Sequence, residues 1–172
     1  MLADPNFDRT IVLMIEDNDE GSAGLVLNRP SPVPVTQALP DLSASAGLAP
    51  PSVLFVGGPV NQNTAIGLAR ATDPDEVDGW VPVAGDVGTV SVSDLEVGLP
   101  DGMADLRVFA GYAGWGPGQL DGEIDAGAWF VVDAHPTDPL SPDPEDLWRT
   151  VVRRQPGRTA WLANYPPDPA VN

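Results

Sequence analysis

The sequence predicts an α+β fold in a single domain that spans residues 1–172. The length falls within the roughly 100–200 residues of one ordinary domain. Short apolar runs follow one another in clusters, which differs from the regular strand–helix alternation of a doubly wound sheet. The 18 glycines and 20 prolines favour short elements joined by many turns.

The first expected element is a β-hairpin at the centre of a sheet. Residues Thr10–Ile15 and Ser22–Asn28 are apolar on both faces, and a polar loop that ends in glycine joins them. The prolines at 30, 32 and 34 are then expected to stop strand pairing, because proline supplies no N–H to a ladder. Further strands are expected at other short apolar runs between turn residues: Val53–Val56, Thr64–Ala69, Val81–Val83, Val87–Val92, Leu106–Ala110 and Ala128–Val132.

Helices are expected at a few places. Residues Val35–Leu39 fit a single helical turn. A helix beginning near Pro117 would turn Leu120 and Ile124 toward the core, since they lie four residues apart. Residues 143–154 carry the full set of helix signals: an acidic cap, a proline in the first position, an apolar stripe and arginines at the end.

The charge of the chain restricts its partners. There are 25 acidic residues against 8 basic ones, all arginine, for a net charge of −17. Binding to nucleic acid depends on neutralising phosphates, and binding to anionic membranes depends on basic residues, so the charge argues against both. The N-terminus lacks the features of a signal peptide, and no apolar run approaches the roughly 20 residues of a membrane span. We therefore expect a cytoplasmic protein.

Few residues offer catalytic chemistry. The chain has no cysteine and a single histidine, His135, and it lacks a Gly-x-Ser-x-Gly motif. A histidine that braces a loop is therefore favoured over a catalytic one. The acidic segment Asp73–Asp78 lacks the residue pattern of a calcium loop, and a solvated loop is favoured. No metal or cofactor site is predicted.

Two segments could bind a ligand. The glycine-rich stretch Gly111–Gly118 precedes a predicted helix and could hold a phosphate on main-chain N–H groups. No lysine follows it, and Asp121 and Glu123 would repel an anion, so a tight turn that lets Trp115 pack over the sheet is favoured. Arg29, directly after a buried strand, could clamp an acidic ligand, but pairing with one of the many nearby carboxylates is favoured.

Taken together, several segments resemble the YqgE/AlgH family. They are Asp4–Leu13, Gly24–Pro30, Gly57–Val60, Gly111–Leu120 with Glu123-Ile124, and Ala128-Trp129. The resemblance implies a split, strongly bent β-sheet folded into a pseudo-barrel with a few flanking helices. It also implies an association with transcriptional regulation, but no reaction that transfers residue by residue. Members often carry a histidine where this chain has Glu16-Asp17, and often an additional apolar strand before the Asp-Pro-x-Phe element at residues 4–7.

The favoured function is a non-enzymatic binding or regulatory module that acts through contacts with a protein or a small ligand. The residues of the candidate binding patch are Asn28, Arg29, Gly58, Pro59, Tyr112, Trp115 and Gln119. The alternative is an enzyme with a carboxylate- or nucleotide-based site, in which Arg29 and the Gly111–Gly118 segment line one cleft. A regulator that binds DNA directly is disfavoured by the charge. Nothing in the sequence indicates the oligomeric state.

Overall fold

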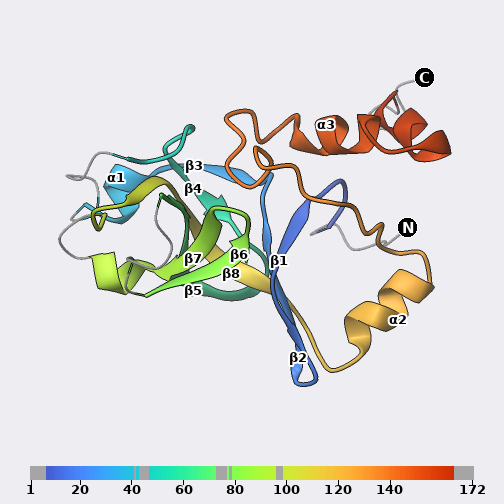
Figure 1. Cartoon of the computed structure of the whole chain (residues 1–172), viewed down its shortest axis with the longest axis horizontal. Coiled ribbons are helices and arrows are strands. Elements are labelled where there is room, and N and C mark those ends of the chain that lie inside the picture. The colour runs from blue at the N-terminus through green and yellow to red at the C-terminus, as the bar shows by residue number, and fades with distance from the viewer. Residues whose placement is uncertain are drawn as a thin grey trace.

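The chain folds around one long strand, β8, in a strongly bent sheet (Figure 1). The computed structural model describes residues 7–40, 42, 47–72, 77, 79–95 and 99–164, without the side chain of Asp94. The strands are β1 (Val12–Asn18), β2 (Gly21–Val26), β3 (Pro30–Pro34), β4 (Val53–Val56), β5 (Val60–Ala71), β6 (Trp80–Ala84), β7 (Val87–Ser91) and β8 (Met103–Trp115). The helices are α1 (Val35–Ala38), α2 (Gln119–Asp125) and α3 (Leu147–Arg153), with short 3₁₀ helices η3 (Val92–Leu95) and η4 (Gly157–Asn164).

The sheet bends because β8 pairs with different neighbours at its two ends. The strand order is β1-β2-β8-β5-β7-β6, and β4 joins β8 in a parallel pair while β3 pairs with β4. β2 pairs with the last residues of β8, and β5 pairs with most of its length. At the bend, Gly111 has a φ of 69°, and a Cβ there would lie 2.6 Å from the carbonyl oxygen of Val60. Only glycine fits this close approach.

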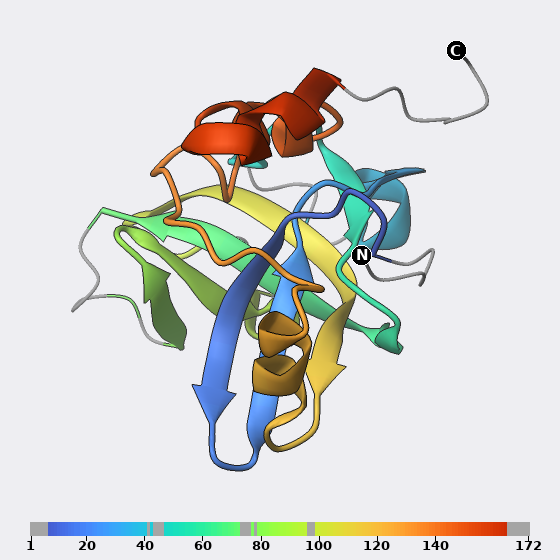
Figure 2. The ribbon, with the colours of Figure 1, turned by 90° about the vertical axis from the view of Figure 1, so that its right-hand side faces the viewer.

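Apolar residues fill the two sides of this bend. One cluster lies among β5, β7, β8 and α1 and includes Val35, Leu106 and Val108. The other joins the β1–β2 hairpin and β4 to helix α3 through residues such as Phe55 and Leu147. α2 lies beside the hairpin, and α3 lies at the opposite end of the same side (Figure 2).

The architecture confirms the predicted α+β class and the bent, nearly closed sheet that the family resemblance implied. The hairpin is also confirmed, but β1 lies at the edge of the described sheet rather than at its centre, and the polar residues 16–18 belong to β1 rather than to the turn. The strands expected at Val53–Val56 and Val81–Val83 are present. None of the helices in the described part is long and apolar enough to cross a bilayer.

Three strand and loop predictions are wrong, and the helix expected over 143–154 begins only at Leu147. The Pro30–Pro34 segment does pair: it forms β3, which meets β4 at Pro30↔Phe55 and Pro34↔Val53. Prolines fit there because an edge strand leaves some N–H positions without a partner. Residues 128–132 form no strand and run as irregular chain after α2. Residues Gly111–Trp115 belong to β8, so the glycine-rich loop is reduced to the turn 116–118. The acidic residues at 73, 75, 76 and 78 lie outside the described residues.

Candidate functional site

The predicted patch falls into two regions of the molecule. Arg29, Gly58 and Pro59 line one hollow of about 290 Å³, which we call the Arg29 hollow. Its other lining residues are Val26, Pro30, Val56 and Gln62. Trp115 lines a different hollow, beside α2, and Gln119 begins that helix. The two hollows share no lining residue.

Asn28 supports the Arg29 hollow from the interior. The side chain is buried, its Nδ2 donates to the carbonyl of Arg9 at 2.8 Å, and its Oδ1 accepts from the N–H of Ile11 at 2.9 Å. Arg29 holds the same N-terminal segment, because its Nη2 donates to the carbonyl of Asp8 at 2.6 Å. Asn28 is therefore a structural residue that fixes the segment beside Arg29.

The turn 57–59, which contributes Gly58 and Pro59 to the hollow, is fixed by main-chain contacts. The N–H of Gly57 donates to the carbonyl of Ala110 and its carbonyl accepts from Val26, both at 2.9 Å. A Cβ on Gly58 would overlap main-chain atoms of Tyr112 and Ala113 in β8. The predicted patch residues Gly58 and Tyr112 thus meet through their main chains, and the turn 57–59 lies flat on β8.

Arg29 differs from the arginines that form ion pairs in the described residues. Arg70 pairs with Asp86 and Asp105, and Arg154 pairs with Asp138. Hydrogen bonds to these carboxylates raise the pKa of both arginines above the ordinary value. Within the described residues, Arg29 bonds to one carbonyl and to no carboxylate. Since a guanidinium carries several N–H donors in a planar fork, Arg29 retains donors for a ligand.

The second region is an aromatic cluster around one carboxylate, which we call the Trp–Glu cluster. It consists of Phe7, Trp115, Gln119, Glu123 and Trp129. Glu123 Oε2 accepts from the indole N–H groups of Trp115 at 3.0 Å and Trp129 at 2.8 Å, and Oε1 accepts from Gln119 at 3.0 Å. The rings of Trp115 and Trp129 meet edge to face, with centroids 5.8 Å apart.

The polar groups of the Trp–Glu cluster satisfy one another. Burial tends to raise the pKa of Glu123, but the hydrogen bonds from Trp129, Gln119 and Trp115 outweigh it, and the pKa lies below the ordinary value. Gln119 also accepts from the N–H of Gly116 at 3.0 Å, which closes the turn before α2. Trp115 and Gln119 therefore act as scaffold that fastens α2 to the sheet.

The enzyme alternative expected a single cleft with a carboxylate of raised pKa. Arg29 and the turn 116–118 lie at separate hollows, and the carboxylate beside that turn, Glu123, has a lowered pKa. His135 is exposed and its ring bonds to Thr137 at 2.9 Å rather than to a serine. Across the part of the chain that the structure describes, no group of three histidine or acidic residues is arranged to hold a metal ion.

Sequence reasoning missed a buried cation, Arg107. This residue is 1% exposed, and its Nη2 donates to the carbonyls of Pro50 at 2.6 Å and Ser141 at 2.8 Å. Its guanidinium lies over the ring of Phe55, 4.4 Å from the centroid, and burial lowers its pKa to about 10. The sequence signal that could have indicated the burial of Arg107 was its position between the apolar residues Leu106 and Val108. Arg107 joins segments far apart in the sequence and plays a structural part.

The bent sheet and these motifs place the chain in a known class of α+β proteins. A model of the AlgH-like family matches residues 1–160, and the chain belongs to that family. A UPF0301 protein of Streptomyces avermitilis is 48% identical over 175 residues, covering 99% of this chain and 90% of the relative. A UPF0301 protein of Thermobifida fusca is 40% identical over 181 residues, covering all of this chain and 90% of that protein.

Solved structures share the fold. The crystal structure of protein DIP2367 from Corynebacterium diphtheriae superposes with a TM-score of 0.80 at 32% identity, covering 95% of this chain and 86% of that one. The solution structure of AlgH from Pseudomonas aeruginosa gives a TM-score of 0.69 at 26% identity, covering 97% and 89%. The resemblance inferred from the sequence motifs is thereby confirmed.

Proposed function

We propose that this protein is a non-enzymatic binding module whose Arg29 hollow receives an acidic group of a small ligand or of a partner protein. The observation that carries the proposal is an arginine with unused donors in a preformed hollow. Among the described residues that line the two hollows, Arg29 is the only arginine. Arginine suits this task because its planar donors match the geometry of a carboxylate or phosphate.

The surrounding residues support a site for one acidic group rather than for a polyanion. Gln62 lies on the wall of the hollow and can offer an amide N–H beside Arg29. The net charge of −17 repels a nucleic acid, so a regulatory role of the kind associated with the family would act through a protein or a small molecule.

A titration followed by amide NMR shifts tests the proposal. Acetate, inorganic phosphate and a short glutamate peptide are added separately, so the ligand classes are distinguished. We expect saturable shifts at Val56, Gly58 and Gln62, which line the hollow, with at least one probe. Binding should weaken about tenfold or more in Arg29→Gln, because the charged fork is lost.

The matched control is Arg153→Gln, which removes the same charge from an exposed position at the end of α3. This variant should bind like the unchanged protein. Equal binding by Arg29→Gln and the unchanged protein, or shifts that do not saturate and spread over the whole surface, would refute the proposed site.

A further inference from the structure

A segment between α2 and α3 is held by side-chain hydrogen bonds at both ends but not in its middle. We call residues 129–139 the strap. At its start, the indole of Trp129 donates to Glu123. At its end, Asp138 accepts from the N–H of His135 and pairs with Arg154, while Arg107 holds the carbonyl of Ser141 just beyond. Figure 2 shows the strap crossing in front of β1.

The middle of the strap has unused main-chain groups. Residues 130–134 make no main-chain hydrogen bond to any other described residue. The side chains of Phe130 and Val131 are also 65% and 78% exposed. Exposed apolar side chains next to unpaired main chain are typical of a surface that receives another chain.

Strand β1, beside the strap, has a free edge. It ends the strand order of the described sheet and pairs only with β2. Val12 lies opposite Val26, whose N–H bonds to Gly57 instead of to β1. Because hydrogen-bonded and non-bonded pairs alternate in an antiparallel ladder, the N–H and C=O groups of Val12 and Met14 point to the outer edge.

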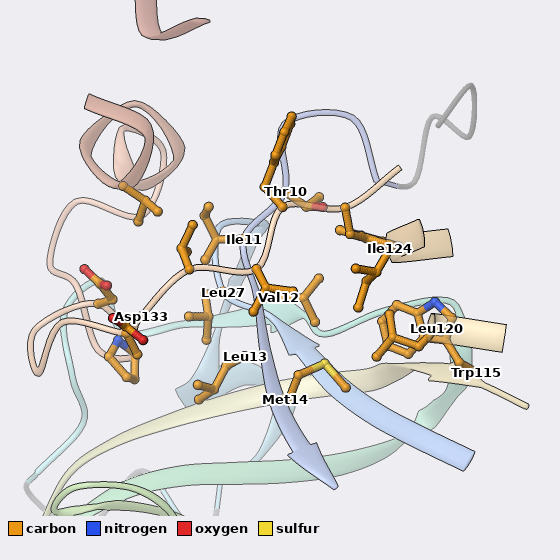
Figure 3. A pocket seen from close by; sticks show the side chains of 18 residues that line it. Thr10, Ile11, Val12, Leu13, Met14, Leu27, Trp115, Leu120, Ile124 and Asp133 are labelled. Carbon is orange, nitrogen blue, oxygen red and sulfur yellow. The ribbon is translucent and has the colours of Figure 1, made fainter. Parts of the chain in front are cut away.

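A slot of about 290 Å³ lies between this edge, α2 and the strap (Figure 3). Its walls are mainly apolar, with Val12, Leu13 and Met14 on one side and Leu120 and Ile124 on another. None of the described residues that line it is positively charged. The charged members of the lining are Asp133, which is exposed, and Asp138, which Arg154 neutralises.

Two of the elements that form the slot also carry exposed carboxylates. Exposed carboxylates lie on the elements that flank it: Glu16 and Asp17 on β1, and Asp121 and Asp125 on α2. Together with the net charge of −17, they favour a basic partner through charge complementarity.

We propose that the slot between β1 and the strap binds an extended peptide segment of a partner protein in which apolar residues alternate with lysine or arginine. An added strand would pair with the outward groups of Val12 and Met14. Since side chains alternate between the two faces of a strand, the apolar residues of one face would fill the slot, and the basic residues of the other would be attracted by the exposed carboxylates on β1 and α2. This surface is separate from the Arg29 hollow, so each proposal can fail without the other.

Synthetic peptides test this inference on the full chain. The first peptide alternates valine and isoleucine with lysine, the second has the same composition in two blocks, and the third has glutamate in place of lysine. We expect saturable NMR shifts at residues 12–14 and 130–134 with the first peptide alone. The N–H groups of Val12 and Met14 should also become protected from hydrogen exchange, and affinity should fall as salt rises.

Two exposed aromatic residues give a matched pair of variants. Phe130→Ser alters the strap, whereas Trp161→Ser alters an aromatic residue of similar exposure (68%) on η4. Phe130→Ser should weaken binding of the first peptide about tenfold, and Trp161→Ser should leave it unchanged. Circular dichroism checks that both variants fold.

Several results would overturn the inference. They are equal binding of the blocked peptide, binding of the glutamate peptide, no shift at residues 12–14, or equal binding by both variants. A further contrary result could come from the protein without peptide. If sedimentation velocity shows self-association and the N–H groups of Val12 and Met14 are then protected from hydrogen exchange, the slot binds a second copy of this chain.

Discussion

The Arg29 hollow and the Trp–Glu cluster arise from similar sequence cues but differ in what their polar groups do. Both combine glycine and proline turns with a few polar side chains. In the Trp–Glu cluster, Glu123 accepts three hydrogen bonds, and both indoles and the Gln119 amide have partners. In the Arg29 hollow, the guanidinium bonds to one carbonyl, and the other lining residues described are Val26, Pro30, Val56, Gly58, Pro59 and Gln62.

This difference separates scaffold from candidate site. A polar group whose partners are all supplied by its own chain stabilises the fold and has little left to offer a ligand. A charged group held in place by one main-chain contact keeps both its position and its donors. Substitutions in the Trp–Glu cluster should therefore change stability, and a substitution of Arg29 should change binding.

The largest effect is expected where the Arg29 hollow depends on close main-chain packing. In Gly58→Ala, the new Cβ overlaps the main chain of Tyr112 and Ala113, so main-chain atoms have to shift. We expect the free energy of unfolding to fall by about 3 kcal/mol, as for other overpacked positions. Urea unfolding followed by tryptophan fluorescence measures it.

Gly122→Ala is the control for this prediction. Gly122 lies in α2 with nothing within 4 Å of an added Cβ. Alanine is the better helix former, so the variant should be as stable as the unchanged protein or more stable by up to about 1 kcal/mol. If both substitutions destabilise equally, the wall of the hollow is not as tightly packed as described.

The next effect concerns the Trp–Glu cluster. Glu123→Ala removes the acceptor of both indoles and should lower the free energy of unfolding by about 2 kcal/mol. Glu123→Gln keeps an acceptor oxygen and should lose about half as much. Denaturation curves compare the two variants, and equal losses would show that hydrogen bonding by Glu123 contributes little.

The sequence predicts the sheet well because its signals are local. The runs that became β1, β2 and β4 are short, apolar and bounded by turn residues, and such patterns fix strands without knowledge of distant contacts. The bend of the sheet was expected only from the family motifs, because no local pattern predicts it. The predictions for Pro30–Pro34 and 128–132 failed because they rested on residue propensities alone. Whether a segment pairs also depends on whether a neighbouring strand has an unpaired edge beside it.

The candidate site could be predicted only in part. Arg29 lies near Gly58 because its carbonyl accepts from the N–H of Val56 at the end of β4, two residues before Gly58, a long-range contact that composition does not encode. The separation of Trp115 from Arg29 is likewise set by which end of β8 pairs with β2. The two tryptophans flanking Glu123 were a usable signal, because buried indoles seek an acceptor.

Acid should weaken the Trp–Glu cluster before it affects the Arg29 hollow. Folding lowers the pKa of Glu123 below its unfolded value of about 4.3, so the ionised form is the one that stabilises. This contribution is complete above the unfolded pKa and is lost as pH falls through the lower folded pKa.

The difference in unfolding free energy between the unchanged protein and Glu123→Gln should therefore shrink as pH falls from 7 to 3. Urea curves at each pH measure it, and a constant difference would contradict the pKa direction.

The smallest effect on stability is expected for Arg29→Gln. The substitution removes one half-exposed side chain whose described hydrogen bond goes to the carbonyl of Asp8, while Asn28 continues to hold the same N-terminal segment through Arg9 and Ile11. The free energy of unfolding should change by no more than about 1 kcal/mol, the usual net value of a single hydrogen bond. A loss as large as that of Gly58→Ala would mean that Arg29 is part of the scaffold, and the contrast between the two regions would disappear. A small loss of stability together with weakened binding of an acidic probe would establish the contrast between the two regions. It would show that the N–H donors of Arg29 serve a ligand rather than the fold.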